Sequence, residues 1–255
     1  MFAETTPPRR SRAGALVIAP LWVCLLIMGM SPALLQAGEH ETFGPSDSMP
    51  GLVTGTVWAL GKHPSASRLP VFKNAEYCGT SLPDRSLLVD HEGRLQAAAV
   101  ILEPVGRRVA VSPERAVLDN RRCAFTPRVQ IVPAGSAVVL KNSDPILHAV
   151  HARLGKETLF NVGLPSWRQV TQVFRKPGIV AVDCDVLHTW MRASVIVTLS
   201  PYFAVTDERG HFQIASVPAG FYDLVVWHEV LGKNTKRIRV STAEASVTDI
   251  TYAMR

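Results

Sequence analysis

Three features of the 255-residue sequence predict an all-β fold. Glycine (17) and proline (18) together make roughly one residue in seven and charged residues only 19%, which favours short strands and turns over long surface helices. Hydrophobic residues make up 47% of the chain, enough to bury a large core. After residue 40, no stretch keeps a 3.6-residue apolar period across three turns. We therefore expect two β-sandwich units.

The N-terminus has the order of an export signal, which we place at residues 1–37. Arg9, Arg10 and Arg12 precede an apolar run over residues 13–30, and small residues follow. An uncleaved membrane anchor is the alternative, because 18 apolar residues just reach the length that spans a bilayer. We expect a periplasmic or extracellular protein with no stable membrane insertion after cleavage.

The net charge of +6 shrinks once this signal is removed. The signal holds three of the 27 basic residues and one of the 21 acidic residues, so the mature chain carries a net +4. Its densest basic stretches are Arg107-Arg108, Arg121-Arg122 and residues 233–239, too few to follow a phosphate backbone. We therefore expect no nucleic-acid partner.

The mature chain begins with a polar linker, residues 38–50, rich in Pro and Ser. Strands are predicted wherever a short apolar stretch of β-forming residues lies between turn residues. They cover residues 52–58, 95–102, 128–132, 137–140, 171–174, 179–184, 193–199, 212–214 and 222–227.

Four residues form a candidate metal site. Cys184, His188 and Met191 fall on one short loop between two predicted strands, and His148 lies some forty residues upstream. A thiolate, two imidazoles and a thioether suit copper, because soft sulfur ligands stabilise Cu(I) while the nitrogens hold Cu(II). His151 is an additional candidate, which we interpret as a rim histidine, a substitute ligand or an exposed side chain.

The sequence around this site resembles the plastocyanin-type cupredoxins. It has F-x-P at 125–127, P-x-G at 133–135, an apolar strand, Asn142 and then His148, with Cys, His and Met following in cupredoxin order. The resemblance spans roughly residues 105–200. It implies an eight-stranded Greek-key sandwich with copper at one end, and an electron carrier that is not an enzyme.

Two departures from the family pattern concern the copper site. Plastocyanins usually have a C-x2-H-x4-M loop, whereas this one reads C-x3-H-x2-M, the spacing that follows the second cysteine of the binuclear copper loop in cytochrome c oxidase subunit two. Val180 stands where that loop has its other cysteine. We therefore expect a mononuclear site. Ala149 stands where many cupredoxins carry an Asn that hydrogen-bonds the thiolate, so the family's surroundings of the thiolate, and its reduction potential, do not carry over to this sequence.

The remaining cysteines are Cys24, which lies in the signal, and the pair Cys78 and Cys123. The oxidising environment outside the cytoplasm favours a disulfide between such a pair, and Cys184 would then remain free to bind the metal. We predict a Cys78–Cys123 disulfide; the alternative is a free buried cysteine at each position.

The flanking residues resemble carboxypeptidase-regulatory or transthyretin-like modules, which are non-catalytic, immunoglobulin-like β-sandwiches. Residues 205–212 and 218–222 are similar to their T-D-x-x-G-x-F and P-x-G-x-Y strands, and residues 51–57 supply their G-x-V-x-G-x-V start. We expect residues 51–104 and 201–255 to form one sandwich split by the cupredoxin-like domain. Two consecutive domains divided near residue 201 are the alternative.

The whole arrangement resembles exported proteins described as methylamine-utilisation-like, a label that fixes no substrate. It predicts a copper protein that transfers single electrons, with a redox protein such as a c-type cytochrome as its partner. A copper carrier or sensor is one alternative. An adhesive β-sandwich without metal is another.

Overall fold

A computed structural model describes residues 50–62, 67–242 and 244–254. Strands make up 57% of these residues and helix 2%, which confirms the all-β prediction. The predicted signal peptide and nearly all of the linker lie outside the described residues. Within the described part of the chain, no helix is long and apolar enough to cross a membrane.

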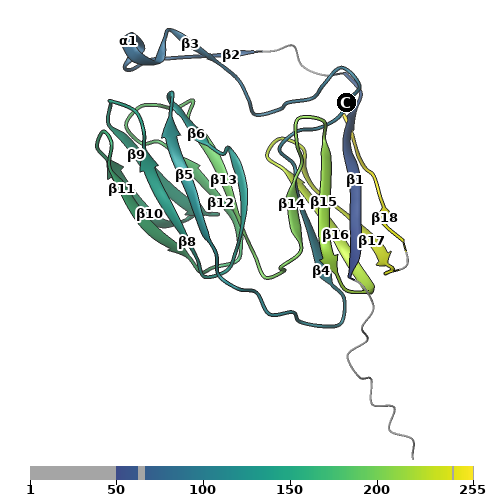
Figure 1. Cartoon of the computed structure of the whole chain (residues 1–255). Coiled ribbons are helices and arrows are strands. Elements are labelled where there is room, and N and C mark those ends of the chain that lie inside the picture. The colour runs from purple at the N-terminus through teal and green to yellow at the C-terminus, as the bar shows by residue number, and fades with distance from the viewer. Residues whose placement is uncertain (1–49, 63–66, 243, 255) are drawn as a thin grey trace, which may run out of the picture. The chain divides into compact units, whose positions relative to one another are not determined.

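The middle of the chain forms a two-sheet sandwich, here called the central sandwich (Figure 1). Its five-stranded sheet has the order β10-β9-β12-β13-β7 and its four-stranded sheet the order β11-β8-β5-β6. The strands are β5 (Arg115–Arg121), β6 (Ala124–Thr126), β7 (Val129–Pro133), β8 (Ser136–Asn142), β9 (His148–Leu154), β10 (Glu157–Leu164), β11 (Gln169–Phe174), β12 (Gly178–Asp183) and β13 (Arg192–Thr198). Among the described residues, the central sandwich thus has one strand more than the expected eight, because the short β6 pairs with β5 as a hairpin.

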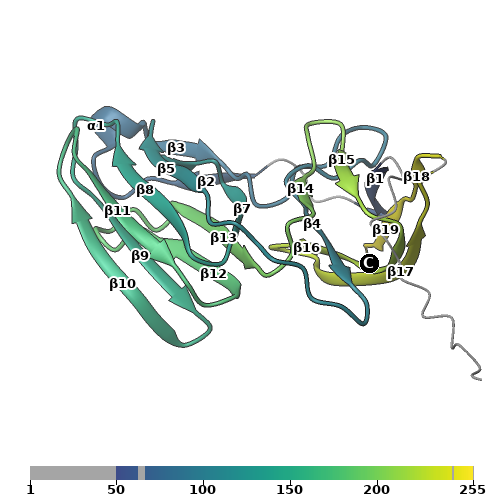
Figure 2. The same ribbon diagram turned by 60° about the horizontal axis from the view of Figure 1, so that its bottom comes forward.

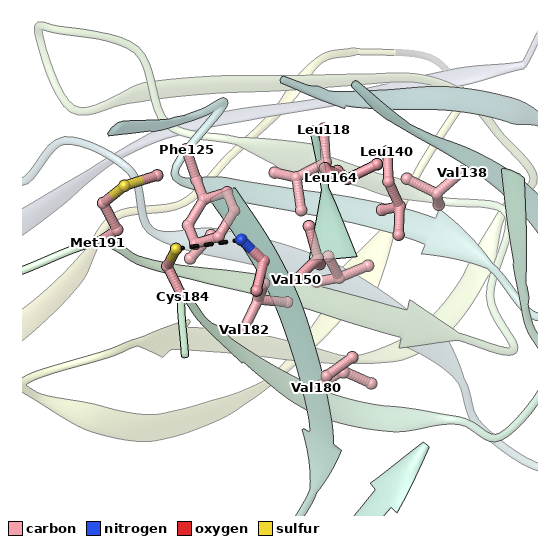
Figure 3. Close-up of a cluster of buried hydrophobic side chains, with 14 of the residues drawn as sticks. Leu118, Phe125, Val138, Leu140, Val150, Leu164, Val180, Val182, Cys184 and Met191 are labelled. Carbon is pink, nitrogen blue, oxygen red and sulfur yellow. Dashed lines mark hydrogen bonds between the residues drawn. The ribbon is translucent and has the colours of Figure 1, made fainter. Parts of the chain in front are cut away.

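Apolar side chains from both sheets fill the interior of the central sandwich (Figure 3). Leu118 and Leu140 come from the four-stranded sheet, Val150 and Val180 from the five-stranded one, and all four are fully buried. Burial of this apolar surface is the main favourable contribution to the stability of such a sandwich. The core therefore fixes the positions of the strand ends, where the candidate site lies.

Two further sheets, here called the flanking sandwich, enclose a second buried core (Figure 2). In the first, β1 pairs with β15, β18 and β19; the second has the order β14-β4-β16-β17. The strands are β1 (Gly51–Leu60), β4 (Ala99–Pro104), β14 (Phe203–Val205), β15 (His211–Val217), β16 (Gly220–His228), β17 (Gly232–Val240), β18 (Ser246–Val247) and β19 (Ile250–Ala253). Strands from before and after the central sandwich are thus paired with each other.

One segment lies outside both sandwiches. It contains a short hairpin of β2 (Arg68–Pro70) and β3 (Ser81–Pro83), with the single-turn helix α1 (Ala75–Cys78) between the two strands. Figure 1 shows these elements outside the sheets of the central sandwich. We call residues 68–83 the strap, because side chains from it reach the candidate site described below.

Candidate metal centre

Strand pairing brings the two separated parts of the predicted site together. Cys184 directly follows β12, and the loop 184–191 leads into β13. His148 is the first residue of β9, which runs antiparallel to β12 with Asp183 opposite His151. The start of β9 therefore lies beside the end of β12, and the remote histidine meets the loop.

His148, Cys184 and His188 form a compact buried group of potential metal donors. The two histidine Nδ1 atoms are 3.1 Å apart, and the Cys184 sulfur lies 3.8 Å from Nδ1 of His148 and 3.6 Å from Nδ1 of His188. Both histidines are fully buried and Cys184 is 4% exposed. The three side chains thus direct two nitrogens and one sulfur at the same small volume.

Cys184 lies in surroundings that favour its thiolate. Burial raises the pKa of the thiol, but its hydrogen-bond contacts with His148, His188 and the main chain outweigh it and lower the pKa from 9.0 to about 6. The main-chain N–H of Ala149 donates to the sulfur at 3.3 Å. Backbone at this position therefore bonds the thiolate, where the family pattern has an Asn side chain.

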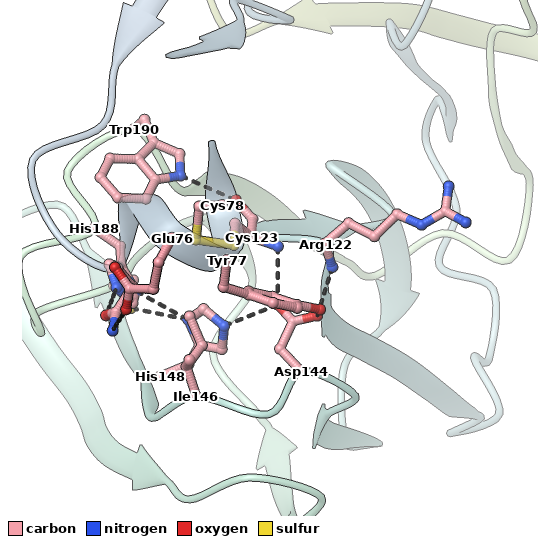
Figure 4. The surroundings of a disulfide bond; sticks show 12 residues. Glu76, Tyr77, Cys78, Arg122, Cys123, Asp144, Ile146, His148, His188 and Trp190 are labelled. Carbon is pink, nitrogen blue, oxygen red and sulfur yellow. Dashed lines mark hydrogen bonds and ion pairs between the residues drawn. A yellow bond between two sulfur atoms is a disulfide. The ribbon is translucent and has the colours of Figure 1, made fainter. Parts of the chain in front are cut away.

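Asp144 orients the ring of His148. The carboxylate is fully buried, and its Oδ2 lies 3.0 Å from Nε2 of His148 (Figure 4). It also accepts hydrogen bonds from the Tyr77 hydroxyl (2.9 Å) and from the main-chain N–H groups of Arg122 (2.6 Å) and Cys123 (2.8 Å). Burial raises the pKa of Asp144, but these bonds outweigh it and lower the pKa below 3.8. The ionised carboxylate accepts the Nε2 hydrogen of His148, which leaves Nδ1 directed at His188 and Cys184.

Asn74 of the strap orients the ring of His188. Its Oδ1 lies 2.9 Å from Nε2 of His188, while its Nδ2 faces Oε1 of Glu76 at 3.3 Å. Because the amide nitrogen is directed at a carboxylate, the carbonyl oxygen is the atom that faces the histidine, and it can only accept. His188 therefore carries its hydrogen on Nε2 and directs a free Nδ1 at Cys184.

Met191 and His151 have different surroundings. Met191 is 1% exposed and shares the core cluster with Cys184; Figure 3 shows both sulfur side chains at the same end of that cluster. His151 lies apart from the donor group: its Nδ1 is 2.9 Å from the Asp185 carboxylate and its Nε2 is 2.9 Å from the Thr158 hydroxyl. Both nitrogens of His151 are thus engaged elsewhere.

The predicted disulfide is present beside the donor group (Figure 4). Cys78 of α1 is bonded to Cys123, and Cys184 is the free cysteine of the described residues. Trp190 donates from Nε1 to the main-chain oxygen of Cys123 at 3.0 Å, and its ring centroid lies 5.0 Å from that of His188. The disulfide therefore ties the strap to the wall of the site.

The donor set fits copper. A thiolate and two imidazole nitrogens converge, with a thioether buried in the same cluster, and this mixture of soft and borderline donors holds both oxidation states. Sequence reasoning identified these donors but missed Asp144 and Asn74. Asp144 lies only four residues before His148, so its spacing could have suggested it as a partner of that histidine. Asn74 lies 114 residues before His188, so no local spacing pointed to it.

No protein-family model matches the chain, and no curated protein matches it. Among solved structures it is similar to a purple cupredoxin from Nitrosopumilus maritimus, with 22% identity over 32% of this chain and 96% of that one and a TM-score of 0.29. It is also similar to amicyanin from Paracoccus versutus, with 19% identity over 38% and 97% of the two chains and a TM-score of 0.31. A copper-containing nitrite reductase from Thermus scotoductus matches with 22% identity, over 38% of this chain and 25% of that one, and a TM-score of 0.31.

Proposed function

We propose that the protein is an exported, mononuclear copper protein that transfers single electrons and is not an enzyme. His148, Cys184 and His188 are the strong ligands in this proposal, and Met191 is a weak axial ligand. The Cys78–Cys123 disulfide supports export, because such bonds persist in oxidising compartments.

The observation that carries this proposal is the direction of the two histidine rings. Each ring has its Nε2 hydrogen committed to an acceptor, Asp144 for His148 and Asn74 for His188. Both Nδ1 atoms therefore point at the same volume as the Cys184 sulfur. These three donor atoms would repel one another unless a proton or a metal ion lay between them, and a metal ion can contact all three.

Copper bound there would supply a one-electron couple. The protein's own contribution is a dry, preorganised set of donors, because His148 and His188 are fully buried and held by fixed hydrogen-bond partners. Ligands that do not move between oxidation states keep the reorganisation energy of electron transfer low. The Ala149 N–H bond to Cys184 also moderates the thiolate charge, which adjusts the reduction potential.

We further propose that residues 51–104 and 201–255 form one module of the carboxypeptidase-regulatory or transthyretin-like type, divided by the cupredoxin-like residues 105–200. The pairing of β1 with β15 and of β4 with β16 supports this division. A redox protein such as a c-type cytochrome is the proposed electron partner, with the weak, small interface expected of a fast shuttle.

Metal analysis and an optical spectrum of the full chain, produced in a host that exports it, test the proposed function. We expect one copper per chain, an intense thiolate-to-copper absorption band and reversible one-electron cycling. Cys184→Ser should abolish the band, because it removes the thiolate. His151→Gln is the matched control and should keep it, because both nitrogens of His151 contact other groups.

Two other outcomes would replace this proposal. A protein that surrenders Cu(I) readily to a chelator and does not cycle would be a copper carrier. A protein that contains no copper, and that Cys184→Ser leaves unchanged, would be a β-sandwich binding protein without a metal. The spectrum, the chelator transfer and the Cys184→Ser comparison separate the three.

A further inference from the structure

The strap reaches both histidines of the candidate centre, although it belongs to neither sheet of the central sandwich. Asn74 contacts His188 directly, and the Tyr77 hydroxyl donates to Asp144, which in turn holds His148. The disulfide from Cys78 forms a third, covalent connection. Three contacts, two hydrogen bonds and one disulfide from residues 74–78, therefore attach the strap to one side of the candidate centre.

The local structure of the strap fixes the direction of Asn74. Its backbone is left-handed, with φ of 58° and ψ of 35°, a conformation that Asn adopts more readily than most residues. Its main-chain oxygen accepts hydrogen bonds from the N–H groups of Tyr77 (3.0 Å) and Cys78 (2.9 Å), which form α1. The turn therefore holds the Asn74 side chain against the Nε2 edge of the His188 ring.

The strap also contributes to the burial of His188. The loop 184–191 is partly open, with Leu187 64% exposed, yet His188 next to it is fully buried. The Nε2 edge of its ring faces Asn74 of the strap, and the Trp190 ring centroid lies 5.0 Å from its own. The strap therefore helps to shield the Nε2 edge of this imidazole from solvent.

We propose that the strap is a functional part of the metal centre: Asn74 is the positioning residue of His188, and closure of the strap over that ring slows exchange of the metal. This inference rests on the proposed function, because it assigns a role toward the copper ion. It predicts that a change at residue 74, which does not touch the ion, alters both the retention of copper and the optical spectrum.

The decisive experiment uses the full chain loaded with copper and three variants of the strap. Asn74→Gly removes the side chain but retains a residue that tolerates positive φ. Lys73→Gly is the matched control, because it adds the same backbone freedom at an exposed neighbour. Asn74→Asp keeps an oxygen acceptor opposite Nε2.

The measurements are the rate of copper transfer to a chelator and the position of the thiolate-to-copper band. We expect Asn74→Gly to increase the transfer rate by roughly 10- to 100-fold, in line with the affinity that metal sites lose when a ligating histidine loses its partner, and to shift the band. Lys73→Gly should match the unmodified protein, and Asn74→Asp should restore slow transfer.

Equal transfer rates and spectra for Asn74→Gly and the unmodified protein would overturn the role of Asn74 while leaving the copper proposal intact. Faster transfer in Lys73→Gly to the same extent would also overturn it, because backbone freedom alone would then explain the effect. An unmodified protein that takes up no copper would instead overturn the proposed function on which the inference rests.

Discussion

Nδ1 of His148 faces Nδ1 of His188 across 3.1 Å, in a volume that excludes solvent. Asp144 and Asn74 accept the Nε2 hydrogens of the two rings. If both rings were neutral, the Nδ1 lone pair of each would therefore point at the Nδ1 lone pair of the other. A proton or a metal ion must therefore lie between them. Burial lowers the pKa of His148, but Asp144 and Cys184 outweigh it and raise the pKa, which places that proton on His148 in the metal-free protein.

Metal binding should accordingly release about one proton per ion near pH 6.5, because the ion takes the place of that proton. Cys184 adds less to this proton release, because its pKa of about 6 means that most of the thiol is already deprotonated near pH 6.5. Calorimetry with Zn²⁺, which does not oxidise the thiol, in two buffers of different ionisation enthalpy measures the release. Metal binding without any proton release would contradict the shared-proton arrangement.

Asp144→Asn should destabilise the fold by about 3 kcal/mol, because it leaves donors that surround a buried carboxylate without their charged acceptor. Four groups donate to Asp144, and an amide would direct its own hydrogens at some of them. Urea unfolding of the metal-free proteins measures the difference. Asp185→Asn is the control: this half-exposed partner of His151 should contribute less than about 1 kcal/mol.

His228 should make the stability of the flanking sandwich depend on pH. Burial, with a smaller contribution from Arg128, lowers its pKa from 6.5 to about 4. Because the folded-state pKa is the lower one, the unfolded chain binds the proton first as the pH falls. The stabilisation is complete above pH 6.5 and is lost toward pH 4, by about 3 kcal/mol.

Urea unfolding across this pH range, compared with His228→Gln, checks the effect. His228→Gln should lose less of its free energy of unfolding between pH 6.5 and pH 4 than the unmodified protein, because glutamine does not titrate. His91→Gln, at an exposed histidine, should keep the slope of the unmodified protein. An unchanged pH slope in His228→Gln would show that other groups produce the acid sensitivity.

Gly55→Ala should destabilise the flanking sandwich by about 1–3 kcal/mol through overpacking. A Cβ at this position of β1 would lie 1.9 Å from the main-chain oxygen of Thr248, so the C-terminal segment would have to move. Gly163→Ala in β10 is the control, because a Cβ there meets nothing within 4 Å. Thermal unfolding of both variants tests whether β1 packs against the C-terminus in solution.

Several of the strands predicted from sequence are rich in apolar residues that face a core, although β5 and β9, which also supply core residues, were missed. The regions of β7, β8, β12, β13 and β16 were identified from such residues. Among the strands missed from sequence, β10 and β17 lie at sheet edges, where polar side chains can face solvent. Lys233, Lys236 and Arg237 of β17 gave no apolar alternation to detect.

The donor group could be predicted because its residue types and spacing occur in one loop and one distant histidine. The residues that orient those donors could not be predicted, because they reach the site only through tertiary contacts. Asn74 and Tyr77 stand in a polar stretch with no strand pattern, and only the folded chain brings them to His188 and Asp144. Side chains that act on a ligand from another segment leave no local periodicity in the sequence.

The strap precedes the central sandwich in the chain, yet it supplies a wall of the metal centre. A fragment cut to residues 105–200 would retain every candidate ligand, from His148 to Met191. It would lack Asn74, Tyr77 and the cysteine that pairs with Cys123. We expect measurements on such an excised domain to describe a more open candidate centre, so a fragment made to test the proposed metal binding should begin before residue 68.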